Sequence, residues 1–464
     1  MILASLLAIL SLARPAPDKG EPLILEGADH FSVAGAGKQV ELVGNVRFHR
    51  GDMKLRSDKA LWDRTQDVVN FQGGFQVEHP SGTIRSTNGR YERASGSAWA
   101  MGNAMLTDSS GKVTLAASDV RYSRPDRTAE AYGNPVFRKL DQSDTLDVRG
   151  NRMVWQERER IAQAIGNVTL RKGSVTARAN LARLDELNHT LVLQGNPSAV
   201  MGKRILSGQE MRLVVDLKRQ TIREIKVLRK AIGTFIGDPD SSGQIQSGRL
   251  TGDTLLAVVD GDTLHDISVW KGAQGFSWKG VDSTRHDDLE GDSIRFSFDG
   301  KKLKQVRAWR KASGRFRGDA DSAGISQIGT LSADTLVANL VNGTFHDVSV
   351  WPKAKGLSWR SNDTTRKDEL EGDSIGFTFE GRNLSAARVH GKARSLYHHQ
   401  ENGVYKGKNE AYGDNLRIAF AKGRVRRVKI AGSSRGTYYG QAKAKVDSLP
   451  KEPAAPKPPV ARKS

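Results

Sequence analysis

The sequence contains no cysteine, and it has few aromatic residues and few histidines. Without thiols, these 464 residues can form no disulfide, no thiolate zinc site and no cysteine nucleophile. Aromatic residues make up only 6% of the chain, and there are 10 histidines. Proteins that bind nucleic acid by base stacking usually combine clustered basic residues with aromatic ones. Here the basic residues are interleaved with acidic ones, so we do not expect nucleic acid as a partner.

Long apolar runs are also rare, and the clearest one lies between Ile2 and Leu12. It is short for a membrane span and matches the apolar region of a signal peptide. We therefore expect residues 1–22 to be a signal peptide and linker, and the protein to be exported to the periplasm. The last segment, 441–464, is rich in lysine, proline and alanine, which is typical of a disordered tail.

Glycine and positive charge are abundant. The chain has 48 glycines and a formal net charge of +20. Such a field attracts polyanions, including nucleic acid, anionic membrane surfaces and phosphorylated glycolipids. A high net charge also keeps a protein soluble. Charge alone does not choose among these explanations.

A Gly-Asn step before an alternating apolar segment organises the first part of the chain. It begins at Gly44-Asn45, and its glycine recurs at intervals of 29, 29, 31, 33 and 29 residues. The later copies are Gly73-Gly74, Gly102-Asn103, Gly133-Asn134, Gly166-Asn167 and Gly195-Asn196. A nearly fixed period indicates stacked repeats. Because glycine and asparagine accept positive φ, we interpret each step as a turn or bulge in a first repeat block, residues 23–205.

Around each step, apolar and polar residues alternate. In the sequence, Val46 and Phe48 flank Arg47, and Met53 and Leu55 flank Lys54. Side chains in a strand point to opposite faces with a period of two. The pattern predicts an all-β protein whose short strands are apolar on one face and basic on the other.

The second repeat block, residues 206–440, has a longer unit and an internal duplication of 81 residues. Trp270 corresponds to Trp351, and Leu289–Ser293 corresponds to Leu370–Ser374. The unit carries a Gly-Asp-Ser/Thr marker, and Asp299-Gly300 between alternating runs predicts a hairpin. A single hairpin cannot bury its apolar face alone, so the stack has to do so.

Candidate catalytic and metal-binding groups are sparse. His265-Asp266 recurs as His346-Asp347, but neighbours in a strand point to opposite faces, so adjacency alone should not pair them. The acidic clusters around Asp287 and Asp368 could bind calcium, although a polar turn is the simpler interpretation. We find no phosphate-binding loop or nucleophile elbow. The sequence therefore predicts no enzyme, no cofactor and no metal site.

The Gly-Asn-Val-x-Phe/Leu recurrence, with strand segments such as Lys54–Ala60 between its copies, resembles the LptA/OstA-like lipopolysaccharide-transport family. The resemblance implies an elongated β-jellyroll, a folded-over V-shaped sheet whose apolar groove takes the acyl chains of lipopolysaccharide. It also implies a periplasmic location, possible outer-membrane association and a role in outer-membrane biogenesis. Its implied partners are lipopolysaccharide (lipid A) and other Lpt-type envelope proteins, namely an inner-membrane complex and an outer-membrane barrel, joined by end-to-end sheet pairing. A homo-oligomer is another option.

The resemblance also suggests which residues contact the lipid. The groove-interior candidates are the inward apolar residues Val46, Phe48, Met53, Leu55, Trp62, Phe75, Val77, Ile84, Val168 and Leu170. The basic candidates for a phosphate-facing rim are Arg47, Lys54 and Arg56, because their cationic groups pair with phosphate. For each apolar candidate, ordinary core packing is an equally good explanation.

Three functional hypotheses follow, and the third and weakest is a polyanion binder driven by the positive charge. In the first, the protein binds lipopolysaccharide and carries or bridges it from the inner to the outer membrane. In the second, it is an exported structural or adhesive β-solenoid with a packed interior and no lipid ligand. A continuous interior groove favours the first, and a filled interior favours the second.

Overall fold

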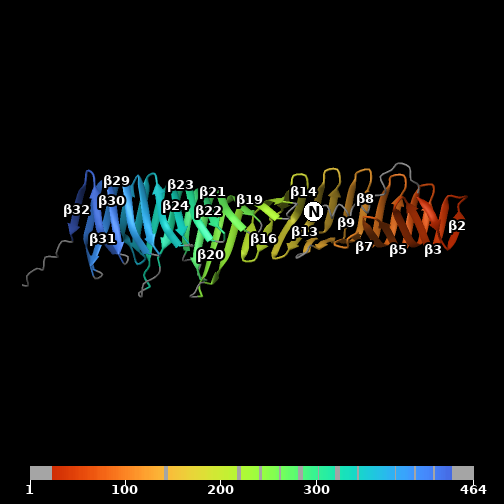
Figure 1. Ribbon diagram of the computed structural model, residues 1–464, viewed down its shortest axis with the longest axis horizontal. Helices are drawn as coiled ribbons and strands as arrows, with labels where there is room; N and C mark the ends of the chain where they lie inside the picture. Colours follow the sequence, from red (N-terminus) through yellow and green to blue (C-terminus); the bar gives the residue numbers. More distant parts are fainter. Residues whose placement is uncertain are drawn as a thin grey trace, which may run out of the picture.

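The computed structural model describes residues 23–140, 145–216, 221–239, 243–260, 263–280, 286–300, 302–318, 324–341, 344–381, 383–401, 404–421 and 424–440. In these residues the chain forms 32 β-strands and no helix, joined in one sheet. Figure 1 shows a long rod whose strands cross the long axis, with chain order running from one end to the other. The all-β fold expected from the alternation is confirmed, as is the elongated form that the resemblance implies.

The strands of the first part of the chain are mostly about a dozen residues long or occur as shorter segments in pairs. They are β1 (Ile24–Gly27), β2 (His30–Ala34), β3 (Gln39–Arg50), β4 (Met53–Asp63), β5 (Val68–His79), β6 (Gly82–Glu92), β7 (Ser97–Asp108), β8 (Val113–Ser123), β9 (Thr128–Tyr132), β10 (Val136–Leu140), β11 (Thr145–Arg149), β12 (Arg152–Gln156), β13 (Ile161–Lys172), β14 (Val175–Asp185), β15 (Thr190–Gln194), β16 (Ser198–Met201), β17 (Arg204–Ser207) and β18 (Glu210–Asp216).

Many strands of the second part are longer. They are β19 (Thr221–Pro239), β20 (Ile245–Asp260), β21 (Thr263–Lys279), β22 (His286–Asp299), β23 (Lys302–Arg317), β24 (Gln327–Val341), β25 (Thr344–Trp351), β26 (Ala354–Arg360), β27 (Asp363–Gly372), β28 (Ser374–Glu380), β29 (Asn383–Glu401), β30 (Val404–Ala421), β31 (Arg424–Ala431) and β32 (Arg435–Gly440). The hairpin turn expected after Asp299 is present.

Each Gly-Asn step is a corner in the sheet. Between β3 and β4 the register jumps from Val43↔Lys59 to Val46↔Ser57, so Gly44 and Asn45 together face a single residue. Their φ values are 78° and 45°. Two residues opposite one is a β-bulge, which bends the strand. The other five steps adopt the same pair of positive φ angles, which confirms the interpretation of the step as a turn or bulge.

The corners fold the sheet over on itself. Phe48 lies beyond the corner of β3, whereas Phe71 lies before the corner of β5, yet their ring centroids are 5.7 Å apart. The two halves of each bent strand therefore face each other, and their apolar sides form one core. The largest fully buried side chains follow this core along the rod: Leu42, Phe48, Phe71, Leu106, Leu115, Leu193, Met211, Leu255, Ile294 and Leu336.

The second block forms its corners differently from what its sequence marker suggested. Between β21 and β22 the register jump leaves Lys271 and Gly272 facing Asp292, and both have positive φ. The Gly-Asp marker thus lies opposite the bulge, and the bulge itself carries basic residues. Arg229-Lys230 and Arg310-Lys311 are two further examples. Alternation and glycine spacing did not reveal these positions because lysine and arginine rarely adopt positive φ.

Strand pairing continues without a break across the boundary expected near residue 205. β19 pairs with β17 and β18 on one side and with β20 on the other.

Among the described residues, no helix is long and apolar enough to cross a membrane. The expected signal peptide and the expected tail lie outside the described residues.

Candidate functional site

The folded sheet has a closed corner edge and a mouth opposite it. The mouth has two lips made of the turns between strands. The first lip includes turns 51–52 and 80–81, which follow β3 and β5. The second lip includes turns 64–67 and 93–96, which follow β4 and β6. A ligand that enters the apolar interior from the side has to pass between these lips.

The apolar candidates face the interior. Most of them are buried: Val46, Phe48, Met53, Leu55, Phe75, Val77, Ile84 and Val168. Leu170 and Trp62 are partly buried. Trp62 pairs with Val40 and Val69 on the inward face near the second lip, and the guanidinium groups of Arg64 and Arg93 lie 5.0 and 5.1 Å from its ring. Whether any of these residues contacts lipid stays a prediction.

The three basic candidates lie on the other side of the sheet. Arg47, Lys54 and Arg56 are exposed and alternate with buried neighbours, so their side chains leave the outer face. Arg56 lies 3.8 Å from Glu78. The sequence pattern thus placed them on the polar face, but the structure does not bring them to the mouth.

A different basic residue reaches the mouth from inside. Arg50 ends β3 at the first lip, is 7% exposed, and donates a hydrogen bond to the Tyr91 hydroxyl, which belongs to β6 at the second lip. The alternation Val46, Phe48, Arg50 contained this signal, because all three residues share one face of the strand. Sequence reasoning missed Arg50 because it assigned basic residues to the polar face.

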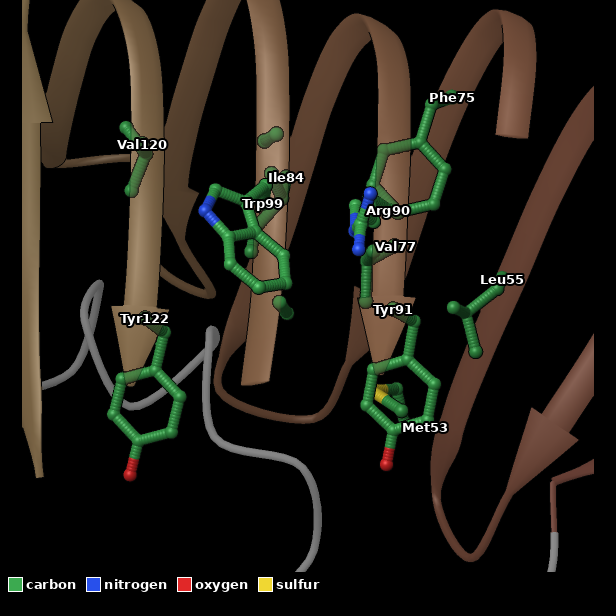
Figure 2. Close-up of a pocket in the computed structure, with 12 residues that line it drawn as sticks. Met53, Leu55, Phe75, Val77, Ile84, Arg90, Tyr91, Trp99, Val120 and Tyr122 are labelled. Atoms are coloured by element: carbon green, nitrogen blue, oxygen red, sulfur yellow. The ribbon is translucent and has the colours of Figure 1, made fainter. Parts of the chain in front are cut away.

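A small apolar cavity lies next to this contact. Residues from β4 to β8 line it, and Figure 2 shows Tyr91 and Tyr122 pointing to the same side of it. Its volume is about 40 Å³. An acyl chain needs far more room than this. In the present conformation, side chains fill this part of the interior.

The interior of the second block is closed by large side chains packed on small ones. A Cβ atom added at Gly275 would lie 3.6 Å from the ring of Phe296, and one added at Gly356 would lie 3.8 Å from the ring of Phe377. Each phenylalanine ring therefore packs against a glycine. These two pairs are related by the 81-residue duplication. Phe316 and Phe345 meet edge to face from opposite lips, 6.3 Å apart. At these contacts, side chains of the two halves meet, and the groove that the resemblance implies stays a prediction.

One expectation about histidine is wrong. The His346 ring lies 2.9 Å from the Asp347 carboxylate, although the two residues are neighbours in β25. The register jumps from Asn339↔Asp347 to Leu340↔Phe345, so His346 is a bulge residue and the alternation of faces fails there. At His265 the register jumps in the same way, but Asp266 instead pairs with Arg295. This bidentate contact lowers the pKa of Asp266, against the effect of burial.

The acidic clusters lie in strands, so the expectation of polar turns is also wrong. Asp287 in β22 accepts the backbone N–H of Arg317 at 2.8 Å, and Asp368 in β27 accepts that of His398 at 2.8 Å. Each carboxylate thereby takes the place of a carbonyl where a strand ladder ends. Burial raises the pKa of both aspartates. Among the described residues, no three metal-ligating side chains converge.

Taken together, a sheet bent at regular corners and closed over an apolar core defines an elongated β-jellyroll built from stacked strands. Residues 27–221 match the family model described as the LptA/(LptD N-terminal domain) LPS transport protein. This segment, which is less than half of the chain, is therefore similar to the OstA-like lipopolysaccharide-transport family.

Two further similarities are more limited. The LPS-assembly protein LptD of Nitrosomonas europaea is 28% identical over 120 residues, which cover 26% of this chain and 14% of that protein. The chain thus matches a small part of that relative's length. The structure of LptH, the LptA-homologous periplasmic component of the lipopolysaccharide transport device of Pseudomonas aeruginosa, has 16% identity and a TM-score of 0.21. That match covers 26% of this chain and 75% of LptH.

Proposed function

We propose that this protein binds lipopolysaccharide in the interior of its folded sheet and carries or bridges it from the inner to the outer membrane across the periplasm. The observation that carries the proposal is the inward apolar face that runs along the rod, in a chain whose first block matches the model of a lipopolysaccharide-transport family. A sheet that is apolar on one face has to cover that face or offer it to an apolar ligand. No catalytic step is required.

Lipid entry requires the lips to separate, because the cavity of about 40 Å³ is too small for an acyl chain. The halves of the sheet meet through side-chain packing and contacts such as Arg50 with Tyr91. Backbone ladders run along the rod, so the lips can part without breaking ladder hydrogen bonds. Acyl chains would then replace the apolar contacts that the halves make with each other.

The ends of the sheet suit partners of similar fold. Among the described residues, β2 pairs only with β3, and β32 pairs only with β30. All described positions of both end strands are exposed. Unpaired strand edges accept a further strand. Pairing of this kind would join the rod end to end with other Lpt-type envelope proteins or with a second copy.

Photo-crosslinking can test the proposal with a matched control on one strand. A photoreactive amino acid replaces Phe48, whose side chain faces the interior, or Arg47, whose side chain leaves the outer face. With added lipopolysaccharide, we expect adducts at position 48 and none at position 47. Equal labelling at both positions, or none at position 48 in a folded protein that was exposed to lipopolysaccharide, would contradict the proposal.

The filled interior also favours the second function considered above, an exported structural β-solenoid without a lipid ligand. This alternative predicts no adduct at position 48 and no change in thermal stability on adding lipopolysaccharide. A ligand that binds only the folded state raises the melting temperature, so a thermal shift separates the two hypotheses independently of crosslinking.

A further inference from the structure

Arginines from both lips lie in the part of the mouth around Tyr91. Arg50 approaches Tyr91 from the first lip, with its guanidinium carbon 6.0 Å from the ring centroid. Arg93 and Arg124 follow β6 and β8 at the second lip. Burial raises the pKa of Tyr91, and the positive charges of Arg50, Arg124 and Arg93 oppose that effect. The Arg124 side chain lies against Gly96, in the same turn as Arg93, so the second lip presents two guanidinium groups near the contact that Arg50 makes from the first.

Most of this positive charge has no acidic counterpart. Arg93 forms an ion pair with Asp67 at 3.0 Å, but among the described residues no carboxylate pairs with Arg50 or Arg124. The Arg50 Nε is buried and makes no hydrogen bond. A buried cation without an anion is unfavourable, because the desolvation of its charge is not compensated. The mouth is therefore prepared for an anionic group.

The same mouth opens onto an apolar surface. Met53, Leu55 and Val77 line the small cavity together with the ring of Tyr91, so Tyr91 borders both the cations and the cavity. A free phosphate ion would use the cations alone. A ligand with an anionic head and an apolar chain would use both surfaces.

We propose that Arg50, Arg93 and Arg124 bind the phosphate headgroup of an acylated lipid, whose chain enters the interior beside Tyr91. This inference rests on the proposed function and adds to it the residues that select the head. The phosphate oxygens accept hydrogen bonds from Arg50 in place of the Tyr91 hydroxyl. Binding of the head thereby releases the contact that joins the lips, and the chain enters where the lips separate.

Titration of the full chain with three probes tests the inference. The probes are lipopolysaccharide, the same lipopolysaccharide with its phosphates removed, and inorganic phosphate. The test variant combines Arg50→Met with Arg124→Gln. The control combines Arg47→Gln with Lys54→Gln, which removes two charges from the outer face of β3 and β4. Melting temperatures establish that each variant is folded, and Arg124→Gln alone serves if the double variant is not.

We expect the test variant to bind phosphorylated lipopolysaccharide roughly tenfold more weakly, the loss expected from charge-assisted hydrogen bonds. It should bind the dephosphorylated lipid as the wild type does, and the control variant should match the wild type with both. If wild type and test variant bind both lipids equally, the inference fails while the proposed function stands. If the wild type binds neither lipid, both fail. If inorganic phosphate binds as tightly as the lipid, the site serves a free anion and the inference fails.

Discussion

The guanidinium of Arg50 donates a hydrogen bond to the hydroxyl of Tyr91 across the mouth of the folded sheet. The two residues belong to β3 and β6 and lie on opposite lips. No backbone ladder joins these strands directly, since β3 pairs with β1, β2 and β4, and β6 pairs with β5 and β7. The contact is therefore a specific link between the two halves of the sheet. It is made by a cation whose burial is unfavourable, because its charge loses contact with water.

Replacing this polar pair by apolar residues should leave the empty protein at least as stable. We expect Arg50→Met with Tyr91→Phe to change the free energy of unfolding by about zero or to raise it by about 1–4 kcal/mol, because the buried charge is removed. Tyr91→Phe alone should destabilise by roughly 1–3 kcal/mol, since Arg50 loses its hydrogen-bond partner. Chemical denaturation measures both. A double variant less stable than Tyr91→Phe alone would show that Arg50 has a structural role.

The corner glycine Gly133 should resist substitution for two separable reasons, and Gly202, in the hairpin turn between β16 and β17, isolates one of them. At Gly133 (φ 74°) an added Cβ would lie 2.4 Å from the Cβ of Ser118, whereas at Gly202 (φ 56°) nothing lies within 4 Å. We expect Gly202→Ala to cost about 1–2 kcal/mol from backbone strain alone. Gly133→Ala should cost roughly 1–3 kcal/mol more from the clash. Equal losses in denaturant titrations would show that the corner relaxes and that the contact with Ser118 does not constrain it.

The basic corners of the second block should gain from glycine. Lys230 has a φ of 56°, while Lys226 occupies a regular position in the same strand, β19. Lys230→Gly should raise stability by up to about 1 kcal/mol, because glycine adopts positive φ without strain. Lys226→Gly should lower it by roughly 0.5–1 kcal/mol. A loss at both positions would mean that the Lys230 side chain contributes more than its backbone strain costs.

The Asp266–Arg295 pair should contribute a pH-dependent increment of stability. Hydrogen bonds from Arg295 lower the folded-state pKa of Asp266 below 3.8. Its contribution is therefore present above pH 3.8 and is lost as the pH falls through the lower, folded value. Asp266→Asn should cost about 0.2–1 kcal/mol at neutral pH, the range for exposed pairs. This difference should vanish in acid.

The double variant Asp266→Asn/Arg295→Gln is the control for this pair. Adding Asp266→Asn to a chain that already carries Arg295→Gln should have little further effect at any pH, because the pair is already broken. Denaturation midpoints between pH 2 and 7 provide the measurement. A constant cost of Asp266→Asn across that range would refute the assignment of the stabilisation to the charge on Asp266.

The sequence by itself determined the strands, their apolar face and the regular corners. Val46 and Phe48 had to lie inside because side chains alternate in any strand, and Gly44-Asn45 had to be a bend because this pair accepts positive φ. Such properties depend on residues close together in the chain, and the periodic repeat reports them. The bulges at His265 and His346 escaped this reasoning because register jumps are set by the partner strand.

Only the tertiary structure decided which residues meet across the mouth. Arg50 and Tyr91 are 41 positions apart, and their contact arises because the corners fold one half of the sheet onto the other. For the same reason, Arg47, Lys54 and Arg56 lie on the outer face while Arg50 reaches the mouth. How closely the halves pack depends on the sum of many side-chain volumes, such as Phe296 against Gly275. Local alternation contains no information about that sum.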